Sequence, residues 1–192
     1  MGRTKDKLQK QIGTAALSKS KLDRLINSPT LKFILFFIFL MILFYTVWLS
    51  SFFNKAINPF ICNTYAFLGS KVLNIFQQGT TITKNVISSP YFSIAVNRGC
   101  DAIEASAIFV AALLAFPAKW KQKLKGLIKG LLILSVINLV RIVSLFFIGR
   151  YYPDFFEFVH VDIWQIIFII LALVLWLDWV KTISSIKTAS EK

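Results

Sequence analysis

One stretch decides the fold: residues 33–53, which read FILFFIFLMILFYTVWLSSFF and carry no charge. It is long enough for the roughly 20 residues that cross about 30 Å of hydrocarbon. The rest of the chain has the same character, because 56% of its 192 residues are hydrophobic, 15% are aromatic and the mean hydropathy is +0.66. A soluble domain of this length cannot cover so much apolar surface. We therefore predict an integral membrane protein.

Three further apolar blocks follow the first, at about 101–118, 126–148 and 161–180. The first block is too long for the apolar region of a signal peptide, and no small-x-small cleavage pattern follows it. It therefore counts as a span. The predicted fold is an all-α membrane protein with about four transmembrane helices, formed by one membrane-embedded domain over 33–180.

The net charge of +13 reports the topology of the chain. In a soluble protein such a charge would favour binding to nucleic acid, but here the basic residues cluster in 1–32, 119–129 and 181–192. The positive-inside rule places these three regions in the cytoplasm. We predict a multi-pass protein of the cytoplasmic (inner) membrane whose tails, 1–32 and 181–192, are both cytoplasmic, and no nucleic-acid partner.

Residues 56–78 are apolar enough for a fifth span, but they carry a polar stripe at helical spacing, made by Asn63, Ser70, Asn74 and Gln77. Phe60, Ile61, Leu68, Val72 and Ile75 lie opposite this stripe. A fifth crossing would put one basic cluster on the wrong side of the membrane. We therefore predict an amphipathic helix on the outer face.

Residues 79–97 change character again. Residues 80–87 and 91–96 contain alternating apolar side chains, and Ser88-Ser89-Pro90 between them is typical of a turn. This pattern predicts a small external β-hairpin, with an irregular loop as the alternative.

The chain places three chemically distinctive side chains at the ends of different spans: Cys100, Arg141 and His160. In the predicted topology Cys100 begins the second span and His160 begins the fourth, both at the outer face. Arg141 lies about seven residues before the outer end of the third span, about 10 Å deep at 1.5 Å per residue. All three are expected to share the outer leaflet, which gives an extracytoplasmic site.

An arginine within a span costs about 2.5 to 3.5 kcal/mol even on lenient insertion scales, so Arg141 should face the interior and have a partner. Glu104 is the natural candidate, one turn below Cys100 on the same helical face. Asn138, three residues before Arg141, can hydrogen-bond in the same pocket. Asp101 lies closer to water. The alternative is that Arg141 and Glu104 form a structural ion pair between two helices.

The three side chains together have the parts needed for thiol acyl transfer. A cation and a helix N-terminus near Cys100 would lower the pKa of its thiol. Arg141 can donate to the oxyanion formed when a carbonyl is attacked, and His160 can take the thiol proton and return it to a leaving amine. Taken singly, Cys100 is equally consistent with a small buried hydrophobe, and His160 with a helix cap.

At these residues the chain resembles the exosortase/archaeosortase family of membrane cysteine transpeptidases. The resemblance covers about residues 70–180 and rests on Arg98-Gly99-Cys100-Asp101 with the following Ala102-Ile103-Glu104-Ala105, on Asn138-Leu139-Val140-Arg141-Ile142-Val143-Ser144-Leu145-Phe146-Phe147, and on His160. Within the family it is most similar to the short bacterial exosortases of the H type. The resemblance implies that Cys100, Arg141 and His160 form the catalytic set.

The resemblance also implies the substrate, which would be the C-terminal sorting signal of a secreted protein, of the PEP-CTERM type. Such a tail has a short motif, a hydrophobic helix and a basic cytoplasmic end. Cleavage would form a thioester with Cys100, which water or an acceptor amine, glycan or lipid would then resolve. The expected surroundings of the helices are the lipid bilayer.

Two other residues have open roles. Cys62 is expected to be a buried thiol, because a disulfide with Cys100 would consume the nucleophile. Trp164, one turn after His160, is expected either to pack in the interior or to support the imidazole. No metal-ligand spacing, phosphate loop or nucleotide motif is present, so we expect no metal and no cofactor.

The competing functions are a small transporter, in which Glu104, Arg141 and His160 form a polar relay, and a non-catalytic membrane subunit.

Overall fold

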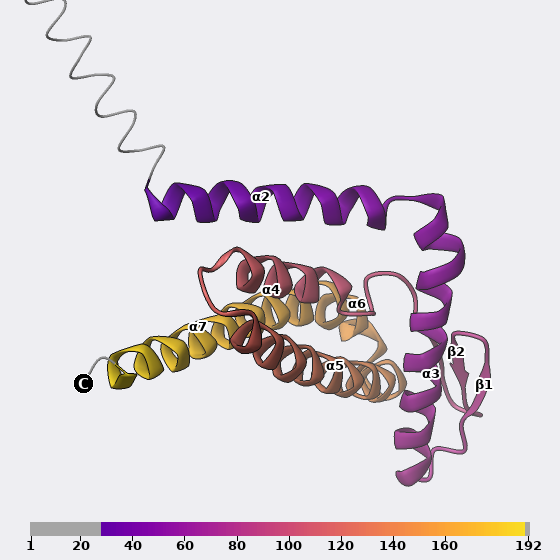
Figure 1. The fold of residues 1–192 in the computed structure, drawn as a ribbon. Helices are drawn as coiled ribbons and strands as arrows, with labels where there is room; N and C mark the ends of the chain where they lie inside the picture. Colours follow the sequence, from indigo (N-terminus) through magenta and orange to yellow (C-terminus); the bar gives the residue numbers. More distant parts are fainter. Residues whose placement is uncertain (1–27, 191–192) are drawn as a thin grey trace, which may run out of the picture.

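The computed structural model describes residues 28–190, and their side chains as far as residue 185. Most of the predicted N-terminal tail, residues 1–27, and the end of the C-terminal tail lie outside the described residues. Between them the chain is a mostly helical membrane protein with a small β-sheet, as predicted (Figure 1).

Three helical segments are long and apolar enough to cross a membrane: Pro29–Trp48, Trp120–Tyr151 and Pro153–Ser185. The first is α2, which begins with the Ser28 side chain accepting from the Leu31 amide at 3.2 Å and with a proline in its first turn. The second is α5, Trp120–Tyr151. The third comprises η2 (Pro153–Phe155), α6 (Phe156–Phe158), the π-helix η3 (Val159–Ile163) and most of α7 (Trp164–Ser190).

The block 101–118, predicted as the second of four spans, forms a shorter helix. This helix, α4, covers Ile103–Ala115 and has 13 residues, which is about 20 Å of length. Its ends are fixed by the backbone: Ala102 has a left-handed conformation with φ of 54°, and Phe116 is extended before Pro117. α4 packs against α2, α5 and α7, so other helices surround it.

The predicted external helix 56–78 is present as α3, Asn58–Ile75, after the π-helix η1, Phe53–Ile57. In Figure 1, α3 turns sharply away from the direction of α2. Its buried face consists of small and apolar residues, namely Cys62, Ala66, Gly69, Ser70 and Leu73, and it packs on α5 and the sheet. Phe60 and Ile75 of the predicted apolar face are 72% and 77% exposed, as the face of a helix that contacts lipid would be.

The sheet has three antiparallel strands, one more than the predicted hairpin: β1 (Thr81–Thr83), β2 (Val86–Ser88) and β3 (Ser93–Ala95), in that order. Ile87 of β2 pairs with Ile94 of β3 and is fully buried. An added Cβ at Gly69 of α3 would lie 3.1 Å from side-chain atoms of both Ile87 and Ile142 of α5. The sheet is thereby fixed against α3 and α5, and it leads directly to Cys100.

Gly130 of α5 gives a test of the packing between α4 and α5. A Cβ at this position would overlap the ring of Phe109, which is 1% exposed. We expect Gly130→Ala to lower the free energy of unfolding by about 1 to 3 kcal/mol, as overpacked cores do. Melting of the purified protein in detergent measures this. Ser135→Ala, at an exposed position of the same helix, is the control, and equal melting temperatures for the two variants would contradict the packing.

Candidate active site

Cys100 lies in the loop that connects β3 to α4, with its side chain only 7% exposed. The loop turns at Gly99, whose φ of 92° favours glycine, and the Cys100 amide donates to the Asn97 carbonyl at 2.9 Å. The sequence predicted that Cys100 begins the second span, but α4 begins only at Ile103, so Cys100 precedes the helix. The loop, rather than a helix, sets the position of the thiol.

Asp101 fixes this loop from its other side. One carboxylate oxygen accepts from the Ile103 amide at 3.2 Å, and the other accepts from the Asn58 side chain of α3 at 3.1 Å. The residue is 3% exposed, so it is part of the interior rather than close to water. Asp101 therefore joins the start of α4 to the start of α3.

His160 approaches the thiol from the π-helix η3. Its Nε2 lies 2.8 Å from the Cys100 Sγ, within hydrogen-bond reach, and its buried Nδ1 has no partner among the described residues. The Phe156 ring lies 5.5 Å from the imidazole, measured between ring centroids. π-Helical turns occur frequently at functional sites. A thiol and an imidazole at this distance can exchange a proton.

Arg141 of α5 connects the cysteine loop to the histidine segment. Its two terminal nitrogens donate to the Gly99 and His160 carbonyls, each at 3.0 Å. Its Nε is buried without a partner among the described residues, and the guanidinium is 5.6 Å from the centroid of the Phe168 ring. A single planar fork thus spans the two segments that carry Cys100 and His160.

Arg141 forms no ion pair with Glu104 within residues 28–190, so the predicted pairing of these two residues is not present. The guanidinium donates to backbone carbonyls instead. Glu104 and Arg141 line the same cavity of about 340 Å³, together with Asp101 and Gln165.

Asn138 contacts the site as expected from its spacing with Arg141. Its amide nitrogen donates to the Cys100 carbonyl at 3.0 Å, while its buried Oδ1 has no partner among the described residues. Asn138 and Arg141 therefore hold two successive carbonyls of the loop, those of Cys100 and Gly99.

The surroundings of the two cysteines set their acidity in different ways. Burial raises the pKa of the Cys100 thiol, while the Arg141 cation and the backbone amide of Asn97 act to lower it. Burial and the Asp101 carboxylate raise the pKa of Cys62 to about 11. Both thiols are free, and Cys62 lies 3.6 Å from the Asn58 side-chain oxygen. Only Cys100 has a base and a cation beside it.

Several residues of the site were not singled out in the sequence. Asn58 holds Asp101, and Phe156 lies beside the imidazole. Arg98 stacks 3.4 Å from the centroid of the Trp48 ring and donates to Asn54 at 3.1 Å, which ties the end of α2 to the loop. In the sequence, the position of Arg98 two residues before Cys100 was the signal that could have identified it as a residue of the site.

Trp164 packs against Phe168. It is buried, and its ring lies 6.0 Å from that of Phe168. In the part of the chain that the structure describes, no three His, Cys, Asp or Glu side chains gather as metal ligands would.

Comparison with protein families matches residues 25–180, most of the chain, to the transmembrane exosortase family. No curated protein and no solved structure matches the chain.

Differential alkylation tests the acidity of the two thiols. We expect Cys100, read in the Cys62→Ser variant, to react with a small neutral alkylating agent faster than Cys62, read in Cys100→Ser. The physical reason is that Cys100 has a cation and an imidazole beside it that favour the reactive thiolate, whereas the pKa of Cys62 is raised to about 11. Adding Arg141→Gln should raise the pKa of Cys100 and slow its alkylation near pH 7. Rates against pH by mass spectrometry check this, and a rate for Cys62 equal to that for Cys100 would contradict it.

Proposed function

Since the chain belongs to the transmembrane exosortase family, we propose that it is a membrane-embedded cysteine transpeptidase or protease that cleaves C-terminal sorting signals of the PEP-CTERM type. The observation that carries the proposal is the 2.8 Å contact between Cys100 Sγ and His160 Nε2. A buried thiol without a base stays protonated, whereas this one has an acceptor in place for its proton.

The reaction follows from that contact. His160 Nε2 takes the proton from Cys100, and the thiolate attacks the carbonyl carbon of the scissile peptide bond. The tetrahedral intermediate collapses, the C–N bond breaks, and the leaving amine takes the proton from the imidazolium. The product is a thioester on Cys100 and a released C-terminal tail. Water or the amine of an acceptor, or a hydroxyl of a glycan or lipid, then attacks the thioester and restores the thiol.

Arg141 has two roles in this proposal. Its bonds to the Gly99 and His160 carbonyls position the nucleophile and the base relative to each other. Its Nε–H is a buried donor without an acceptor among the described residues, and it is available to an oxyanion. Asn138 positions the Cys100 carbonyl from the same face of α5.

The substrate would enter from the membrane. We place the site at the extracytoplasmic side of the cytoplasmic membrane, because the lysine-rich segment 119–129 lies at the other end of α5. The hydrophobic helix of the sorting signal would lie beside the bundle, and its motif would reach the loop at Cys100. Strand β1 is a candidate for pairing with an extended motif, since its three residues are exposed and it is an edge of the sheet.

The alternative functions have less support from the contacts. A relay through Glu104, Arg141 and His160 needs these groups to exchange protons or ions with one another. Arg141 instead donates to two carbonyls, and the His160 ring faces a thiol. A non-catalytic subunit would not need a thiol and an imidazole in contact.

Replacement of the nucleophile tests the reaction. We expect Cys100→Ala and Cys100→Ser to abolish cleavage of a co-expressed secreted reporter that ends in a sorting-signal tail encoded in the same genome. Cys62→Ser should cleave normally, because Cys62 lies outside the proposed site. Immunoblots of the reporter measure the cut, and mass spectrometry of the wild-type protein should detect a reporter fragment on Cys100. Full cleavage by Cys100→Ala would refute the proposal.

The planar fork of Arg141 has its own test. We expect Arg141→Lys to lower the cleavage rate by about 10² to 10³, since one ammonium cannot hold both carbonyls at the same geometry and also serve an oxyanion. Arg150→Lys is the matched control on the same helix, where the guanidinium contacts Gln78 and Tyr91. Initial rates on the same reporter compare the two variants. Equal rates would show that Arg141 acts only as a point charge.

A further inference from the structure

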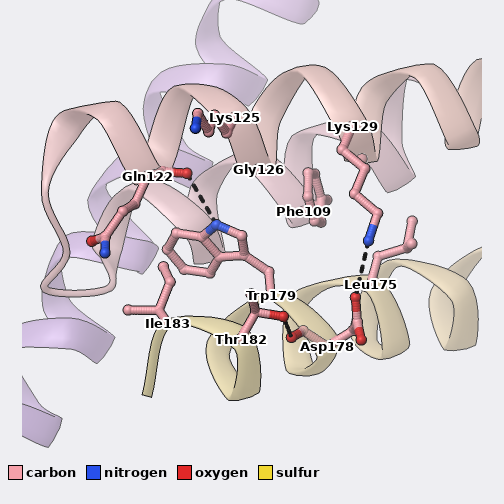
Figure 2. A pocket seen from close by; sticks show the side chains of 11 residues that line it. Phe109, Gln122, Lys125, Gly126, Lys129, Leu175, Asp178, Trp179, Thr182 and Ile183 are labelled. Carbon is pink, nitrogen blue, oxygen red and sulfur yellow. Dashed lines mark hydrogen bonds and ion pairs between the residues drawn. The ribbon is translucent and has the colours of Figure 1, made fainter. Parts of the chain in front are cut away.

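A second cavity lies between α5 and α7, far from the proposed catalytic site. It has a volume of about 170 Å³ and is lined mainly by α5, α7 and Phe109 of α4 (Figure 2). Gly126, on its α5 wall, lies 15 residues before Arg141, which is about 22 Å along the helix. The cavity is therefore at the end of the bundle that carries the basic loop.

The inner wall of the cavity is apolar. Phe109, Leu175 and Ile183 contribute to it, and the two glycines of α5 allow aromatic rings to come close. A Cβ at Gly126 would overlap the Trp179 indole, and one at Gly130 would overlap the Phe109 ring. The Trp179 indole nitrogen donates to the Gln122 carbonyl at 3.2 Å, which fixes the ring at this wall. The space is thus a built pocket with rigid aromatic sides.

The rim of the cavity carries two lysines and one aspartate, Asp178. Lys125 and Lys129 line it, and Figure 2 shows both side chains on the α5 side. Lys129 pairs with Asp178 at 3.3 Å, the one ion pair within residues 28–190, so Lys125 has no acidic partner there. The surrounding segment 119–129 contains five lysines and no acidic residue.

We propose that this cavity binds an anionic phospholipid, with the phosphate at Lys125 and Lys129 and part of an acyl chain against the apolar wall. Basic pockets between membrane helices bind acidic lipid headgroups. A basic peptide segment is disfavoured by the lysines, and a free phosphate would leave the apolar wall uncovered.

The position of the cavity favours a lipid over a soluble ligand. The two helices that form most of its lining expose apolar residues along their length, among them Ile128 and Leu132 of α5, and Leu173 and Leu177 of α7. In a membrane these side chains lie against acyl chains, so the cavity opens between two helices that lipid surrounds. Trp120, 74% exposed near the start of α5, is typical of the membrane interface.

Lipid binding to the purified, delipidated protein tests the proposal. After phosphatidylglycerol is added back, we expect native mass spectrometry to detect one bound phosphatidylglycerol per chain. We also expect phosphatidylglycerol to raise the melting temperature more than phosphatidylcholine does. Soluble glycerol 3-phosphate should give no shift. An equal effect of phosphatidylcholine, or an equal shift with glycerol 3-phosphate, would overturn the proposal in favour of an unselective or a soluble ligand.

Variants locate the site. The double variant Lys125→Ala/Lys129→Ala should lose about fivefold in affinity per lysine. Thr182→Phe, at an exposed position that lines the cavity, should lose binding with every charge retained. Lys55→Ala/Lys121→Ala removes the same charge from exposed positions outside the lining and should bind as the wild type does. Binding by the first two variants equal to that of this control would overturn the assignment, independently of any effect on sorting-signal cleavage.

Discussion

The arrangement of the site depends on one buried guanidinium. Arg141 is 4% exposed and donates to the carbonyls of Gly99 and His160, which belong to segments 42 and 19 residues away from it. A cation inside a membrane protein needs strong acceptors, and backbone carbonyls provide them where no carboxylate is paired with it. The same two bonds that satisfy Arg141 therefore bring the Cys100 loop and the His160 segment together.

The other parts of the structure support this arrangement from outside. The three-stranded sheet packs on α3 and α5 through Ile87, and it delivers the chain to Gly99, whose positive φ turns the loop toward α5. Asp101 and Asn58 fasten the far side of the loop to α3. α3 and the sheet thus serve to position a short loop, while the long helical segments carry the base and the cation.

The membrane class, α2, α3 and the strand-forming character of 79–97 could be predicted, because apolar length and periodicity are local properties of a sequence. The length of α4 could not, since the ends of this helix are set by backbone turns at Ala102 and Phe116. The partner of Arg141 was also predicted wrongly. Glu104 was chosen because it lies one helical turn from Cys100. Sequence spacing does not reveal the backbone carbonyls that a loop and a π-helix leave free to accept from Arg141.

The sequence by itself determined that the chain is a membrane protein of the transmembrane exosortase family. It also determined that Cys100, Arg141 and His160 are the distinctive polar groups. Only the tertiary structure decided that Sγ and Nε2 lie 2.8 Å apart and that the guanidinium bridges two carbonyls. The physical reason is that hydrophobic length acts over neighbouring residues, whereas these contacts join residues 60, 42 and 19 positions apart, and helix packing alone sets the angles and depths at which such residues meet.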